Sequence, residues 1–193
     1  MKFAKTALAT LVAVTSVLSS ASAIADMSNG LIKSKSIYGA VDLGTVTPLA
    51  SYLSSPTMVR VAVGADLAAL PAVSIEANIA MFSDSTADFP GTGLSETITR
   101  SSFGASGIYT LPLQNGFSVF GKAGLNYTMA KDTIGGTVMA DNNKVLLAYG
   151  IGAKYDVNSK YAVRAMWEDL GDVSGNGFST SQTALSIGGV MRF

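Results

Sequence analysis

The stretch that decides the fold is the end of the chain, Ser186-Ile187-Gly188-Gly189-Val190-Met191-Arg192-Phe193. Successive side chains of a β-strand point to opposite faces, so Ile187, Met191 and Phe193 share one face. Ser186 and Arg192 lie on the other face. The segment therefore predicts an amphipathic strand that stops on an aromatic residue.

The other end of the chain predicts export. Lys2 and Lys5 form a short basic region, and residues 7–18 form an apolar run with Thr and Ser interspersed. Ala21-Ser22-Ala23 then supplies the small residues that a signal peptidase requires. We therefore predict a signal peptide over residues 1–23.

Cleavage is expected after Ala23, with Ala25 as the alternative, and residues 24–35 then form an N-terminal lead-in. An uncleaved anchor is the other interpretation, but the apolar run is short for a transmembrane helix. The chain contains no Cys, which excludes disulfides and a lipid-modified N-terminal cysteine.

Composition narrows the class further. Hydrophobic residues make up 48% of the chain and charged residues only 13%, yet beyond the predicted signal peptide there is no run of apolar residues long enough for a membrane helix. Strands that alternate apolar and polar side chains would reconcile these facts. The sequence has no cluster of basic residues, so we expect no nucleic-acid partner. The absence of His and Cys argues against zinc, haem and a His-based catalytic triad, so no metal, cofactor or enzymatic activity is expected.

The remaining sequence alternates with a period of two. Eight such segments cover residues 36–46, 58–67, 72–81, 100–111, 117–129, 145–157, 161–169 and 182–193. Their connections are alternately long and short, and all five prolines lie in or beside them. This pattern predicts an all-β protein: an eight-stranded antiparallel up-and-down transmembrane β-barrel over residues 36–193. The four long connections, expected to face the cell exterior, are residues 47–57, 82–99, 130–144 and 170–181.

The charged residues well inside these segments all lie on the polar face: Asp42, Arg60, Asp66, Glu76, Lys122, Lys154, Asp156, Arg164, Glu168 and Arg192. Eight strands enclose a space that side chains can fill, and charges buried there must pair. We therefore predict a barrel-interior charge network of Asp42, Arg60, Asp66, Glu76, Lys122, Lys154, Arg164 and Glu168. Glycines on the same face would make room for it. Tyr38 also has this parity and is expected in the core.

The chain resembles the OmpA-type small outer-membrane barrels. Ser186, Gly188, Met191 and Phe193 match the assembly signal of that family, which the barrel-assembly machinery reads. The resemblance implies location in the outer membrane of a Gram-negative bacterium. It also implies contact with lipid and lipopolysaccharide. The peptidoglycan-binding domain that larger members carry is not expected here.

The same resemblance implies an interior pair between Arg164 of the seventh strand and Glu76 of the third. Lys122 matches an inward basic residue of the fifth strand. Some members carry an alternative Lys on strand four and Glu on strand six, which are proposed to open a pore. Here those positions look like Ser106 and Lys154, so a static pair is expected and a switchable gate is not.

These observations favour a structural and surface-interaction role, in which four extracellular loops contact host or phage ligands. A narrow pore for ions or small solutes is the main alternative. A lipid-modifying enzyme and a soluble lipocalin-like binder are two further readings. The binder would place the apolar residues around an internal ligand and the charges in solvent.

Overall fold

The structure is a computed structural model that describes residues 32–48, 50–89, 91, 93–175 and 178–193. The predicted signal peptide lies outside the described residues, as does most of the predicted lead-in. No helix in the described part of the chain is long and apolar enough to cross a membrane.

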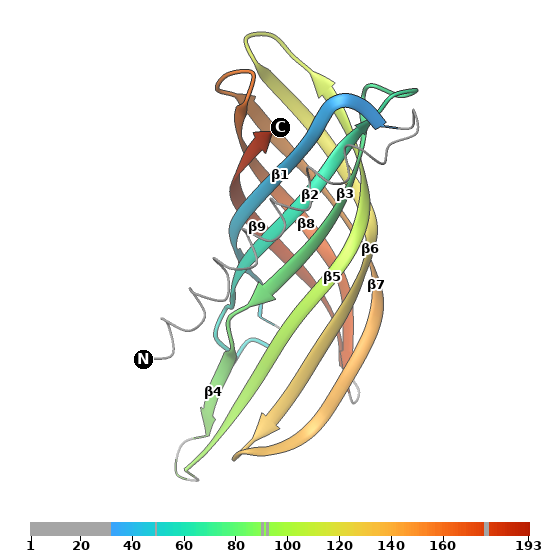
Figure 1. Ribbon diagram of the computed structural model, residues 1–193. Coiled ribbons are helices and arrows are strands. Elements are labelled where there is room, and N and C mark those ends of the chain that lie inside the picture. The colour runs from blue at the N-terminus through green and yellow to red at the C-terminus, as the bar shows by residue number, and fades with distance from the viewer. Residues whose placement is uncertain (1–31, 49, 90, 92, 176–177) are drawn as a thin grey trace.

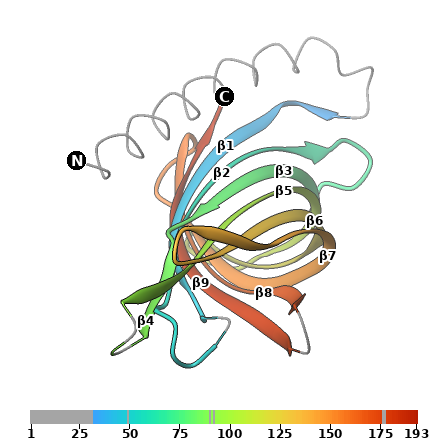
Figure 2. The same ribbon diagram turned by 90° about the horizontal axis from the view of Figure 1, so that it is seen from below.

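The described residues form nine strands: β1 (Ile32–Val46), β2 (Thr57–Leu67), β3 (Val73–Phe82), β4 (Ser85–Phe89), β5 (Leu94–Pro112), β6 (Phe117–Ile134), β7 (Thr137–Asp156), β8 (Tyr161–Gly175) and β9 (Phe178–Arg192). Eight of them close an antiparallel ring, in which β3 pairs with β5 and β9 returns to β1. Strand β4 pairs only with β5, outside the ring (Figures 1 and 2). The predicted eight-stranded antiparallel barrel is confirmed.

The long connections contain more strand than the sequence suggested. Strands β6 and β7 run on to Ile134 and Thr137 and meet at Gly135-Gly136, where both residues have positive φ, 56° and 84°. That backbone is the one that two-residue hairpins favour. The expectation of a loop over residues 130–144 was therefore wrong. Because the side chains alternate on both sides of the Gly-Gly turn, the backbone pairing of β6 and β7 continues as far as the turn.

Two other long connections differ in the same way. The segment expected as a loop over residues 82–99 contains β4 and the first residues of β5. The segment over residues 170–181 contains the end of β8 and the start of β9. Strand β1 likewise begins at Ile32, before the expected start at residue 36, through a register irregularity between Ile32 and Ile37. Only residues 47–57 lack a strand over most of their length.

The two faces of the barrel differ as the parity predicted. Large apolar side chains on the outer face stay exposed, such as Ile151 at 68% and Ile187 at 66%. Arg60 on the inner face is only 2% exposed. Two apolar residues at inward positions, Ile108 and Phe120, pack inside against Met166. The apolar side therefore faces outward, which excludes the lipocalin-like arrangement.

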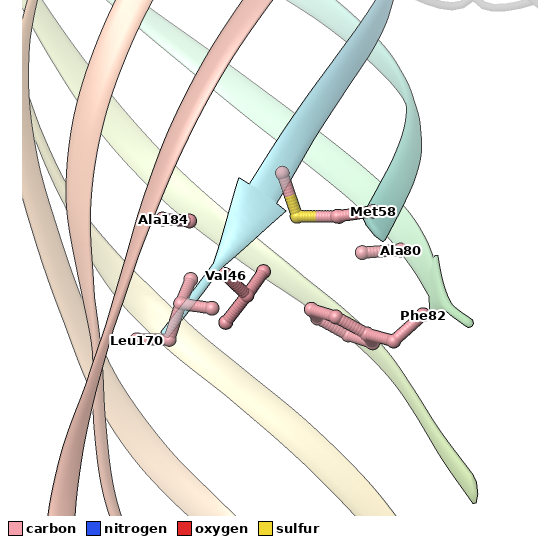
Figure 3. Close-up of a cluster of buried hydrophobic side chains, with 6 residues drawn as sticks. All are labelled: Val46, Met58, Ala80, Phe82, Leu170 and Ala184. Carbon is pink, nitrogen blue, oxygen red and sulfur yellow. The ribbon is translucent and has the colours of Figure 1, made fainter. Parts of the chain in front are cut away.

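The interior is layered along the barrel axis. Read along β1, Ala40 belongs to one apolar cluster, Asp42 is charged and Val46 belongs to a second apolar cluster. We call the second cluster the outer plug; it consists of Val46, Met58, Ala80, Phe82, Leu170 and Ala184 (Figure 3). It lies where the strands approach the long connections. A charged middle layer is thus enclosed between apolar layers on both sides.

Candidate functional site

Six buried side chains in the middle of the barrel form one chain of ion pairs. Arg164 holds Asp42 in a bidentate contact, with Nε–Oδ1 at 2.8 Å and Nη2–Oδ2 at 2.7 Å. Its Nη1 lies 2.7 Å from Oε2 of Glu76, and Oε1 of Glu76 lies 3.0 Å from Nζ of Lys122. Lys122 also lies 3.3 Å from Glu168, which pairs with Arg60. We call this set the charge chain.

The charge chain draws on five strands and nearly closes on itself. Its two ends, Asp42 on β1 and Arg60 on β2, are directly opposite each other in the ladder. All six residues are at most 7% exposed. Three carboxylates balance three cations, so every charge has an opposite neighbour. Because removal of one partner leaves a bare buried charge, such a chain fixes the packing of the strands that carry it.

Inward glycines separate the partners. Gly188 lies between Arg164 and Asp42 across β8, β9 and β1, and Gly150 lies between Lys122 and Glu168 across β6, β7 and β8. A Cβ atom on Gly188 would overlap Asp42, and one on Gly150 would overlap Glu168. Long charged side chains on the two flanking strands can therefore meet over the middle strand only because the residue between them has no side chain.

Tyr38 joins the chain through a third such glycine. Its ring crosses Gly64 on β2, and its hydroxyl donates to Oε2 of Glu76 on β3 at 3.4 Å. The sequence pattern places Tyr38 in the core but does not include it among the predicted site residues. Its polar-face parity, with a glycine at the cross-strand position, was the available signal.

Two predicted members lie outside the charge chain. Asp66 accepts a hydrogen bond from Ser74 Oγ at 2.7 Å. Lys154 lines a cavity of about 120 Å³ with Asp66, Tyr38 and Arg192 on the side of the short turns. Among the described residues none forms an ion pair with Lys154. Arg192 pairs with Asp156 at 2.7 Å, where both side chains are partly exposed.

The four residues of the predicted assembly signal lie on β9 and directly after it. Ser186 is buried inside, Gly188 separates charged partners, and Phe193 is 41% exposed. The backbone N–H of Phe193 donates to the carbonyl of Ile37 at 3.0 Å, so the last residue extends the β1–β9 seam. Met191 lies opposite Gly39 on the same seam.

A second group of polar side chains lies on the inner wall beyond the outer plug. Arg100 of β5 is 7% exposed, and its guanidinium stacks 4.7 Å from the ring centre of Phe82. Arg100 Nε and Nη1, Thr128 Oγ1 and Asp132 Oδ1 are buried without a hydrogen-bond partner in the described structure. We call Arg100, Thr128 and Asp132 the mouth cluster. Sequence reasoning missed Arg100 because it is the first residue of its predicted segment.

The loop over residues 47–57 reaches the same end. Tyr52 donates its hydroxyl hydrogen to Oε2 of Glu96 at 3.3 Å. Partial desolvation and the neighbouring Glu96 carboxylate raise the pKa of Tyr52. The backbone of Ser54 donates to the Thr86 carbonyl at 3.2 Å, so this loop also covers the outer edge of β4. Within the described ranges, no three His, Cys, Asp or Glu residues gather in a metal-binding group.

The chain is similar to solved structures of outer-membrane barrels and of a designed transmembrane barrel. Neisserial surface protein A is 19% identical with a TM-score of 0.58, covering 81% of this chain and 97% of that one. The N-terminal β-barrel domain of Pseudomonas aeruginosa OprF is 11% identical with a TM-score of 0.56, covering 81% and 97%. Ail of Yersinia pestis, solved in complex with the heparin analogue sucrose octasulfate, is 15% identical with a TM-score of 0.52, covering 82% and 97%. At these identities the likeness concerns the fold.

No curated protein matches the sequence significantly. Residues 8–193, however, match the family described as outer membrane protein beta-barrel domain. The match covers nearly the whole chain and agrees with the outward apolar face and the closed antiparallel ring. The chain therefore belongs to the outer membrane protein β-barrel family, and its location is the outer membrane of a Gram-negative bacterium.

Proposed function

We propose that this protein is a surface-interaction barrel, whose membrane-embedded ring supports binding elements outside the cell. One observation carries the proposal: the interior is filled with a charge chain and an outer plug, whereas β5, β6 and β7 continue far beyond that plug. A filled ring supplies a rigid base, and binding residues commonly lie on the segments that such a base presents.

The extended hairpins are the proposed contact elements. Both hairpin ends expose apolar side chains, Leu94 at 46% and Met139 at 61%, beyond the part of the ring where all eight strands pair. The similar barrel Ail is solved with a heparin analogue, and this supports testing glycans together with protein ligands. Host molecules and phage are the proposed partners, beside lipopolysaccharide in the surrounding leaflet.

Shortening one hairpin tests the proposal without opening the barrel. Asp132 and Ala140 are opposite each other, so an Asn-Gly turn in place of residues 133–139 closes the ladder early and keeps Asp132 in the chain. Bacteria that carry this variant should lose adhesion to host cells or matrix. Heat-modifiable mobility and surface protease accessibility should stay as in the wild type. Adhesion and phage sensitivity that persist after both this hairpin and the β4–β5 hairpin are shortened would refute the proposal.

A narrow pore is the second candidate, favoured by one feature of the charge chain. Glu76 is shared between Lys122 and Arg164, so loss of either contact leaves the other in place. Planar-bilayer recording decides this. A pore function requires conductance by the wild type that changes in Glu76→Ala, and silence of both proteins removes it.

Export and assembly complete the proposal. Residues 1–23 would direct the chain out of the cytoplasm. Ser186, Gly188, Met191 and Phe193 would then be read by the barrel-assembly machinery. The exposed ring of Phe193 at the β1–β9 seam supports this, because the residue is accessible to a partner at the place where the ring closes. Phe193→Ala should lower the amount of folded protein in the outer membrane, measured by heat-modifiable mobility.

A further inference from the structure

The mouth cluster occupies one patch of the inner wall. Arg100 on β5 is opposite Ala130 on β6, so Thr128 and Asp132 are its two diagonal neighbours on the same face. Lys144 is opposite Thr128 on β7 and adds a second cation to this wall. Glu96 has the same parity on β5, nearer the hairpin tip. The patch therefore places cationic groups beside the outer plug and carboxylates farther out.

Arg100 is the most unusual member of the cluster. It is 93% removed from solvent, and among the described residues no carboxylate lies within ion-pair distance of it. Its one described partner is the Phe82 ring at 4.7 Å. A cation–π contact offsets only part of the free energy that burial of an unpaired cation costs. The N–H groups at Nε and Nη1 of Arg100 are thus buried and can donate hydrogen bonds to a ligand.

The neighbouring orphaned atoms define what would satisfy the patch. A guanidinium presents parallel N–H groups that fit the oxygens of a phosphate, sulfate or carboxylate. Thr128 Oγ1 can donate a further hydrogen bond to the same anionic group. Asp132 Oδ1, which has no donor of its own in the described structure, can accept from a hydroxyl group. A sugar that bears an acidic substituent carries both an anionic group and adjacent hydroxyls, and such sugars are abundant at cell surfaces.

We propose that the mouth cluster binds an anionic sugar unit, with its acidic group on Arg100 and Thr128 and a hydroxyl on Asp132. This assignment rests on the proposed surface role and gives it a ligand chemistry. Two sources carry such units: phosphorylated sugars of lipopolysaccharide in the same membrane, and sulfated or uronic glycans of a host. The shared chemistry is an acidic oxyanion beside free hydroxyls.

The test uses the full-length exported protein in lipid nanodiscs. Calorimetry measures binding of a sulfated heparin disaccharide, the same disaccharide without sulfate, and a phosphorylated lipopolysaccharide core oligosaccharide. We expect at least one acidic sugar to bind about 10-fold or more tightly than the unsulfated disaccharide, because charge-assisted bonds are worth more than neutral ones. Whichever acidic sugar binds identifies the source. Equal affinity for all three probes overturns the proposal.

Two variants separate the site from general attraction by the surface. Arg100→Gln should weaken binding about 10-fold or more. The matched control Lys131→Gln removes a cation of the neighbouring strand that lies on the opposite face, and its affinity should remain within twofold of the wild type. Equal loss in both variants, or none in Arg100→Gln, overturns the proposal. If Arg100→Gln fails to fold, as judged by heat-modifiable mobility, NMR of the wild type decides. The Arg100 Nε–H resonance must shift with the acidic sugar.

The outcome also distinguishes the two proposals. If hairpin shortening abolishes adhesion while Arg100→Gln binds acidic sugars normally, the surface role stands and the mouth site is wrong. If purified protein binds acidic sugars through Arg100 but adhesion never depends on the hairpins, the site stands and the adhesion role is wrong.

Discussion

Replacing Arg164 with Met should cost more stability than any other single charge removal in this barrel. Arg164 satisfies two carboxylates at once, with three contacts between 2.7 and 2.8 Å, and its side chain is only 5% exposed. The variant leaves Asp42 and Glu76 in the interior with one cation fewer. Breaking a buried pair of this kind typically costs about 3–5 kcal/mol. We expect a loss of that order in the free energy of unfolding.

The assay is urea unfolding in lipid vesicles, followed by the fluorescence of Trp167, the one tryptophan of the chain. Arg192→Met is the matched control, because Arg192 likewise contacts an Asp carboxylate at 2.7 Å but its side chain is 27% exposed. Solvent screening limits that loss to about 1 kcal/mol or less. The double variant Asp42→Asn/Arg164→Met removes both charges of one pair and should recover most of the loss. Equal destabilisation in Arg164→Met and Arg192→Met would refute the reasoning.

Three further outcomes are expected from the same unfolding measurement. Gly188→Ala should lower the free energy of unfolding by about 1–3 kcal/mol, because its Cβ overlaps Asp42. In the control Gly189→Ala the Cβ meets open space on the other face, and the loss should be less than about 1 kcal/mol. Similar losses in both variants would show that the loss comes from reduced backbone freedom and not from steric overlap. Tyr38→Phe removes the 3.4 Å hydrogen bond to Glu76 and should lower the free energy of unfolding by about 0.5–1.5 kcal/mol. An unchanged stability would show that this hydrogen bond does not contribute. The variant with Asn-Gly in place of residues 133–139 should unfold within about 1 kcal/mol of the wild type, because surface changes away from buried features have small effects. A large loss would mean that the hairpin supports the ring.

Most of the fold could be predicted from the two-residue alternation of apolar and polar side chains along each strand. A strand of period two assigns each residue to a face once its phase is known, and the apolar residues set that phase. Parity therefore assigns Asp42, Glu76 and Glu168 to the inner face, and these side chains are buried in the structure, as is Tyr38. Parity gives no height along the barrel axis, however. Lys154 has the correct face but is one layer nearer the short turns than the charge chain, beside the cavity with Asp66.

Partner choice and loop structure were harder for the same physical reason. Which acid meets which base depends on the stagger between neighbouring strands, and a single sequence does not specify it. The Glu76–Arg164 contact is present at 2.7 Å, but the second carboxylate on Arg164, Asp42, was not foreseen. The sequence predicts loops where the structure has hairpins, because Ser, Thr and Gly favour turns. Their alternation, together with the adjacent glycines at 135 and 136, was the stronger signal.

The contact between Asp42 and Arg164 joins residues 122 positions apart, on the first and eighth strands of the chain. A growing sheet that lacks its last strands therefore carries Asp42 without its cation, and the apolar medium makes such an intermediate unfavourable. The β1–β9 seam and the charge chain become complete in one event. Insertion should consequently be cooperative, with partly zipped intermediates scarcely populated and the final closure setting the rate at which folded protein accumulates.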